Sequence, residues 1–143
     1  GKSFIDSLRI SIKPMINAFN FFCLYANSDG LKANRIEYSR DFNNPLDNYI
    51  LSKLKSAVSS IDSNLSSYDT VSACNEFNSF FEVLNNWYIR RSRQRFWSNE
   101  HNQDKQDAYD VLYSCLLYMC ESCAAMLPFT TEHIFQSLVN QDD

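Results

Sequence analysis

The chain has 143 residues and a formal net charge of −4, with 45% apolar and 15% aromatic residues. This composition excludes a disordered chain, and the length fits one domain, residues 1–143, around a single buried core. Only 2 glycines and 3 prolines are present, which disfavours the many tight turns of an all-β fold and favours long helices.

The first predicted helix has apolar residues at alternating three- and four-residue steps. They are Phe4, Leu8, Ile12, Met15, Phe19 and Phe22. Pro14 interrupts this stripe and is expected to kink the helix, because proline removes one backbone donor and crowds a carbonyl. Gly30 is expected to cap its C-terminus. The periodicity then fades, and we predict a loop without regular structure up to Asn44.

The second predicted helix begins at "NPLD", with Asn44 as its N-cap and Pro45 in its first turn. Its apolar stripe consists of Leu46, Ile50, Leu54, Val58, Ile61 and Leu65. This stripe predicts a helix that buries one face and exposes the other.

The third predicted helix is capped by Asp69 or Thr70 and runs as one regular helix to about Trp97. The side chains that it is expected to bury are Ala73, Phe77, Phe80, Leu84 and Trp87. A polar connection, residues 98–104, separates it from the next helix.

The fourth predicted helix has a stripe of Ala108, Leu112, Leu116, Met119, Cys123 and Leu127. Pro128 interrupts or ends it, and a short last helix, "TTEHIFQSL", follows with Thr130 or Thr131 as its cap. Short connections between long amphipathic helices indicate antiparallel neighbours. We therefore predict an all-α fold, an antiparallel helical bundle of four main helices plus a short C-terminal helix.

The 5 cysteines form an odd set, in which Cys120 and Cys123 spell C-x-x-C inside a helical pattern. No second pair or histidine stands at metal-ligand spacing, so we predict buried, inert thiols in a reducing cytoplasm and no metal site. The apolar runs are far shorter than the roughly 18 residues of a membrane span, so we expect no membrane contact.

Positive charge is concentrated in "NWYIRRSRQRFW", residues 86–97. If the third helix is regular, a projection at about 100° per residue places Arg91 and Arg95 on the core-facing stripe. There they need acidic partners or a helix end that projects beyond the core, because an unpaired buried charge is costly. A second face, directed away from the core, carries Asn86, Arg90, Arg93 and Trp97.

This second face suits RNA, because guanidinium groups bind phosphate oxygens and aromatic rings stack on unstacked bases. The alternative is a solvated basic helix end, which the helix dipole also favours. The candidate RNA-binding residues are Asn86, Arg90, Arg93 and Trp97, together with Arg91 and Arg95 of the same motif. No catalytic residue is expected.

"NWYIRRSRQRFW" resembles a characteristic motif of the anticodon-binding domain of class I isoleucyl-tRNA synthetases. "LDNYILSKL" (residues 46–54), "YDTVSACNEFNSFFEVLNNWY" (68–88) and "AAMLPFTTEHIFQSL" (124–138) are similar to other parts of that domain, in order and spacing. The valyl enzyme typically has an acidic residue soon after its Trp-Tyr pair, whereas this chain has Ile89-Arg90-Arg91, which favours isoleucine.

The resemblance implies an internal fragment of a larger synthetase that docks on the anticodon stem and loop of isoleucine tRNA. It implies an isoleucine–tRNA ligase as the parent enzyme, cytoplasmic and monomeric, using ATP and Mg²⁺ in a catalytic domain of the same chain. The ATP-site motifs of that family are absent here, so the fragment alone is expected to be non-catalytic and without cofactors. Two alternatives are a helical protein–protein interaction module and the equivalent domain of a valyl-type synthetase.

Overall fold

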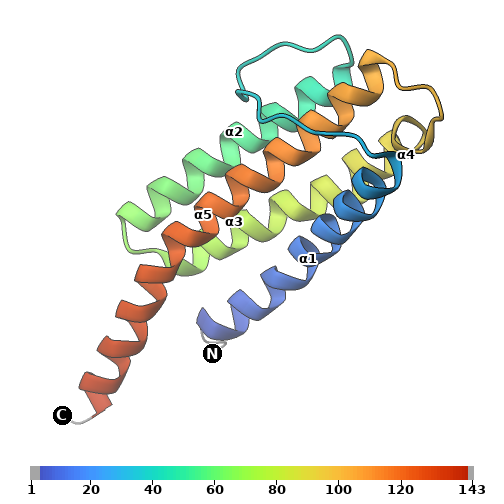
Figure 1. Cartoon of the computed structure of the whole chain (residues 1–143). Coiled ribbons are helices and arrows are strands. Elements are labelled where there is room, and N and C mark those ends of the chain that lie inside the picture. The colour runs from blue at the N-terminus through green and yellow to red at the C-terminus, as the bar shows by residue number, and fades with distance from the viewer. Residues whose placement is uncertain (1–3, 142–143) are drawn as a thin grey trace.

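A computed structural model describes the backbone of residues 4–141, and the side chains of Asp6, Ile10 and residues 12–126. Its elements in chain order are α1 (Phe4–Asp29), α2 (Pro45–Ser66), α3 (Thr70–Val83), η1 (Leu84–Ile89), α4 (Arg90–Trp97) and α5 (Gln103–Gln141). The π-helical segment η1 joins α3 and α4 into one continuous rod. Four helical rods run antiparallel to their sequence neighbours, which confirms the predicted all-α bundle (Figure 1).

Capping residues fix where the helices begin and end. Asn44 Oδ1 accepts a hydrogen bond from the Leu46 amide at 3.0 Å, and Asp69 Oδ1 accepts one from the Ser72 amide at 3.0 Å. Each bond satisfies an amide that the first helical turn leaves without an internal partner. Gly30, at φ +61°, ends α1 in the left-handed conformation that glycine adopts without strain.

The rods pack around one core, and both α5 and the rod formed by α3, η1 and α4 contact all three of the others. α1 and α2 both contact α3 and α5, so α1 and α2 lie on opposite corners of the bundle. Aromatic rings fill much of the interior between them, with Phe77, Phe81, Tyr88 and Phe96 all at most 2% exposed. Their burial stabilises the fold by about 25 cal/mol per Å² of apolar surface removed from water.

The long connection between α1 and α2 has no regular structure, as predicted, and crosses the outside of α5 (Figure 1). Two hydrogen bonds hold it there: the Ile36 amide donates to Ser114 Oγ and the Asn34 amide to Asp110 Oδ1, both at 2.8 Å. Ile36 and Phe42 are buried beneath it. These two bonds attach the segment to α5 as it links opposite corners of the bundle.

The prediction of a separate short C-terminal helix is wrong. α5 is continuous from Gln103 to Gln141 and runs through Pro128, and its last turns extend beyond the ends of α2 and α3 (Figure 1). A proline inside a helix removes one backbone hydrogen bond but already has a helical φ, so a long helix can continue through it. The side chains of Thr130 and Thr131, predicted as caps, lie outside the described part.

Most of the predicted stripes face the core, with one exception in α1. Met15, Phe19 and Phe22 pack against the core, whereas Ile12 is 38% exposed. The bundle covers α1 on only two sides, which leaves the edge of its stripe in solvent. The predicted core residues Phe4, Leu8 and Leu127 have side chains outside the described part.

Candidate functional site

The arginine motif begins in η1, where the helix is wound differently from the prediction. A π-helical turn contains one residue more than an α-helical turn, and one residue corresponds to about 100° of rotation. The residues that follow are therefore rotated relative to a regular helix. Ser92 and Phe96 are buried, while Arg91 is exposed. The predicted position of Arg91 on the core stripe is thus wrong.

Arg95, by contrast, lies against the core with the acidic partners that its predicted position required. Its side chain is 9% exposed, and its two terminal nitrogens each donate to one oxygen of Asp47 at 2.7 Å. Asp104 adds an ion pair at 3.1 Å and a backbone acceptor at 2.9 Å. Arg95 therefore has no free guanidinium edge for RNA except Nε, which is buried.

Tyr88 completes this buried cluster by donating its hydroxyl to Asp47 Oδ1 at 2.7 Å. Burial and the nearby Asp47 carboxylate raise the pKa of Tyr88 well above its ordinary value, so it stays a donor. Burial lowers the pKa of Arg95, but the hydrogen bonds to Asp47 and the charges of Asp47, Tyr88 and Asp104 together outweigh it, so the net pKa is raised. The cluster joins the first turns of α2 and α5 to the last turn of α4.

A second buried network fixes the turn that follows the motif. Lys105 is 1% exposed; its ammonium group donates to the Ser98 carbonyl and pairs with Asp29 at 3.0 Å. The Tyr109 hydroxyl also donates to Asp29, at 2.6 Å. Burial raises the pKa of Asp29, but the hydrogen bonds from Tyr109 and Lys105 and the nearby positive charge together outweigh it, so the net pKa is lowered. The end of α1 is therefore tied to the turn beyond Trp97.

The exposed arginines lie beside aromatic rings. Arg91 Cζ is 5.4 Å from the centre of the Trp87 ring, and that ring is 4.4 Å from the ring of Tyr49 on α2. Lys53 lies over the other ring, with Nζ 5.5 Å from the Tyr49 centre. Trp87, predicted to be buried, is half-buried in this arrangement. We call these four side chains the Trp87 stack.

A second aromatic cluster involves Trp97, which is 50% exposed. Its indole nitrogen donates to the Tyr25 hydroxyl, and Arg93 Cζ is 6.0 Å from the centre of its ring. A guanidinium over an indole face is attracted to it, by about 0.5–1 kcal/mol at an exposed site. Trp97 and Arg93 therefore form a pair on the α1 side of the rod.

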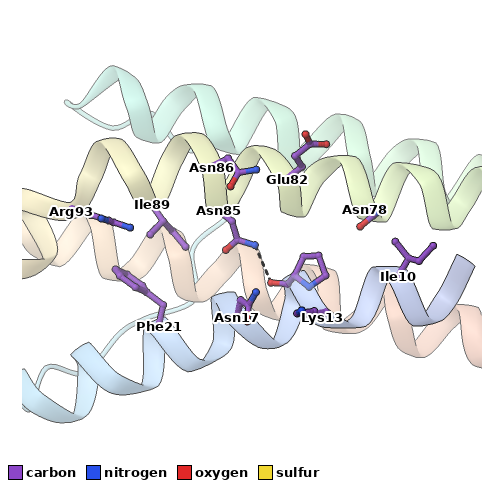
Figure 2. Close-up of a pocket in the computed structure, with 11 residues that line it drawn as sticks. Ile10, Lys13, Asn17, Phe21, Asn78, Glu82, Asn85, Asn86, Ile89 and Arg93 are labelled. Carbon is purple, nitrogen blue, oxygen red and sulfur yellow. Dashed lines mark hydrogen bonds between the residues drawn. The ribbon is translucent and has the colours of Figure 1, made fainter.

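Asn86 and Arg90 lie between the two aromatic clusters. Asn86 lines both a shallow hollow of ≈ 430 Å³, shared with Trp87, Arg90 and Arg91, and a groove of ≈ 580 Å³ between α1 and α3 that ends at Arg93 (Figure 2). Five of the six predicted residues, all except Arg95, are thus exposed along this stretch of helix. We call these five the arginine surface: Asn86, Arg90, Arg91, Arg93 and Trp97.

Sequence analysis missed the residues that complete this surface and its support. Tyr49 and Lys53 lie on the polar face of α2, where nothing local distinguishes them from solvated residues. Asp47 is in the first turn of α2, where an acid is common because it complements the helix dipole. Its role as the partner of Arg95 depends on a contact across 48 positions of the chain.

The cysteines take no part in the arginine surface. All five are free; Cys74 and Cys115 are buried, Cys120 and Cys123 are partly buried and Cys23 is exposed. Burial raises the pKa of Cys74 to about 11, so its thiol is protonated at neutral pH. Within the described residues, no three His, Cys, Asp or Glu side chains are grouped as a metal site would require.

No helix in the described part of the chain combines the length and apolarity needed to cross a membrane. The arginine surface combines exposed cationic side chains with an exposed indole ring. Three guanidinium groups can each donate to phosphate oxygens, and the exposed rings of Trp97 and the Trp87 stack can receive unstacked bases.

Comparison with known proteins agrees with this chemistry. Residues 47–143 match the family model described as the anticodon-binding domain of tRNA ligase. The chain is 52% identical over 140 residues to the isoleucine–tRNA ligase of Rickettsia prowazekii (strain Madrid E), covering 98% of this chain and 13% of that protein. It is 48% identical over 138 residues to the isoleucine–tRNA ligase of Wolbachia pipientis wMel, covering 96% of this chain and 12% of that protein. The chain thus spans about an eighth of the length of these relatives.

Proposed function

This chain belongs to the family of anticodon-binding domains of tRNA ligases, and we propose that it binds the anticodon stem and loop of isoleucine tRNA. The longer protein is then an isoleucine–tRNA ligase, a cytoplasmic monomer. Its catalytic domain, in the same chain, uses ATP and Mg²⁺ to join isoleucine to that tRNA. Relatives named isoleucine–tRNA ligase, similar over nearly the whole of this chain, support the choice of amino acid.

The observation that carries the proposal is the arginine surface. Arg90, Arg91 and Arg93 are exposed on one stretch of helix, and Arg91 and Arg93 each lie over an indole ring. Guanidinium groups bind the backbone of a folded RNA loop while the rings accept bases that leave the stack. A net charge of −4 does not oppose this, because the local field at the docking surface steers the partner.

Arg95 acts as a positioning residue in this proposal, not as an RNA contact. Its pair with Asp47 fixes the last turn of α4, which carries Arg93 and Trp97. The rigid support matters because a binding group held in place loses less conformational freedom when the RNA docks.

A salt titration of binding to the isoleucine tRNA stem-loop tests the proposal. Each neutralised phosphate contributes about −0.7 to −0.9 to the slope of log affinity against log salt. We expect Arg90→Ala, Arg91→Ala and Arg93→Ala each to weaken binding and to reduce the slope by about one unit per lost contact. Lys55→Ala removes an exposed cation from the groove between α2 and α5 and should change neither quantity.

The same titration separates RNA binding from a protein-docking role. An apolar interface is far less sensitive to salt than a set of phosphate contacts. The proposal is contradicted if the wild-type chain does not bind the stem-loop, or if its affinity for the stem-loop does not depend on salt. Equal affinity for a stem-loop from a non-cognate tRNA would leave RNA binding intact and refute the assignment to isoleucine.

A further inference from the structure

The groove between α1 and α3 is lined by uncharged amides on both walls. Asn17 comes from α1, Asn78 from α3, and Asn85 and Asn86 are consecutive residues of η1. Figure 2 shows Asn17 and Asn85 facing one another across the groove. Each asparagine offers a carbonyl acceptor and two amide donors, the groups that pair with the edges of nucleobases. The volume of ≈ 580 Å³ falls within the range of small-molecule sites.

The orientation of Asn85 is determined by a hydrogen bond. Its Nδ2 donates to the carbonyl oxygen of Pro14 at 3.0 Å, across the groove (Figure 2). A carbonyl can only accept, so the amide cannot flip without placing two oxygens together. Asn85 Oδ1 is therefore held as an acceptor at the groove wall. The π-helical turn of η1 contains both Asn85 and Asn86, and such turns are frequent at functional sites.

Both signs of charge line the groove, with Lys13 and Arg93 as cations and Glu82 as the anion. Arg93 lies at one end, beside Trp97, and is exposed. Glu82 is at the rim of the groove, with its carboxylate directed away from α1 (Figure 2). Phe21 and Ile89 add apolar surface against which a flat ring can pack.

From this arrangement we propose that the groove binds one unstacked base of the RNA loop, and that this base carries an amino group. The base donates to Asn85 Oδ1, Asn17 contacts it from α1, and its flanking phosphates lie on Arg93. The inference rests on the proposed function and adds to it a specificity-determining groove, distinct from the phosphate contacts.

The test measures the affinity of this chain for a series of stem-loops in which each loop nucleotide is replaced in turn. Asn85→Ala and Asn17→Ala should lose the discrimination of roughly 5- to 100-fold that the wild type shows at one loop position. Their salt slopes should stay unchanged, because neither side chain neutralises a phosphate. Asn20→Ala on α1 and Asn75→Ala on α3 are matched controls, since both amides are exposed outside the groove.

Circular dichroism establishes whether each variant is folded. If Asn85→Ala does not fold, Asn17→Ala still tests the proposal. If both groove variants bind the whole series as the two controls do, the groove proposal is wrong while the proposed function stands. If the preferred base carries no amino group, the proposal is also wrong. A wild-type chain that binds no stem-loop would overturn both.

Discussion

Replacement of Arg95 and of its neighbour Arg91 should have very different effects on stability. Arg95→Ala removes two hydrogen bonds of 2.7 Å from the fully buried Asp47 carboxylate and leaves it the hydrogen bond from the Tyr88 hydroxyl. Breaking a buried pair from one side costs about 3–5 kcal/mol. Arg91→Ala removes an exposed guanidinium from the face of Trp87, at a cost of about 0.5–1 kcal/mol.

Thermal unfolding followed by circular dichroism measures both effects. At about 3 °C per kcal/mol for a chain of this size, Tm should fall by ~9–15 °C for Arg95→Ala and by at most ~3 °C for Arg91→Ala. The double variant Asp47→Leu/Arg95→Met should recover much of the loss, because it replaces the buried pair with apolar groups of similar volume. Similar losses for both arginines, or a larger loss for Arg91→Ala, would refute the register that η1 imposes.

Four further predictions follow from single features of the fold. Ser92→Ala should raise the free energy of unfolding by about 0.5–1.5 kcal/mol in urea titrations, because it removes a buried hydroxyl with no partner among the described residues. Gly30→Ala should lower it by about 1 kcal/mol, since φ is +61° and no other atom lies within 4 Å of an added Cβ. The folded-state pKa values of Asp29 and Glu121 are lowered, so their stabilisation is complete above the unfolded pKa of about 4, and Tm should fall as pH drops below it. Elemental analysis should find no bound zinc, and reductant should leave Tm unchanged, if the five cysteines are inert thiols; stoichiometric zinc would contradict this.

Local chemistry made much of the fold predictable. The N-cap Asn44 and the C-terminal glycine Gly30 are confirmed, and Asp69 is one of the two caps predicted for the third helix, because capping depends on residues a few positions apart. The apolar period places most of the core for the same reason, since a helix repeats its faces every three to four residues. The concentration of arginines and aromatic residues between Asn86 and Trp97 is a property of the sequence alone, and so is its resemblance to a tRNA-binding motif.

The positions of individual side chains in that motif depend on the tertiary structure. A projection assumes constant winding, and the π-helical turn of η1 shifts every later residue, so that Arg91 moves outward and Ser92 inward. Hydrophobic periodicity does not report a single extra residue in one turn. Sequence also misleads at Pro128. Proline removes one backbone hydrogen bond and was expected to interrupt or end the helix, but α5 continues through it.

Contacts between distant segments determine the features that the sequence did not predict. Asp47 is an ordinary first-turn acid until folding brings it to Arg95, and four separate asparagines line one groove only because α1 packs beside α3. The sequence by itself determined the helices, their caps and the presence of a basic, aromatic surface, since these follow from near neighbours. Packing decided which arginine is buried in an ion pair and which are free to bind, because burial of a charge is set by groups far away in the chain.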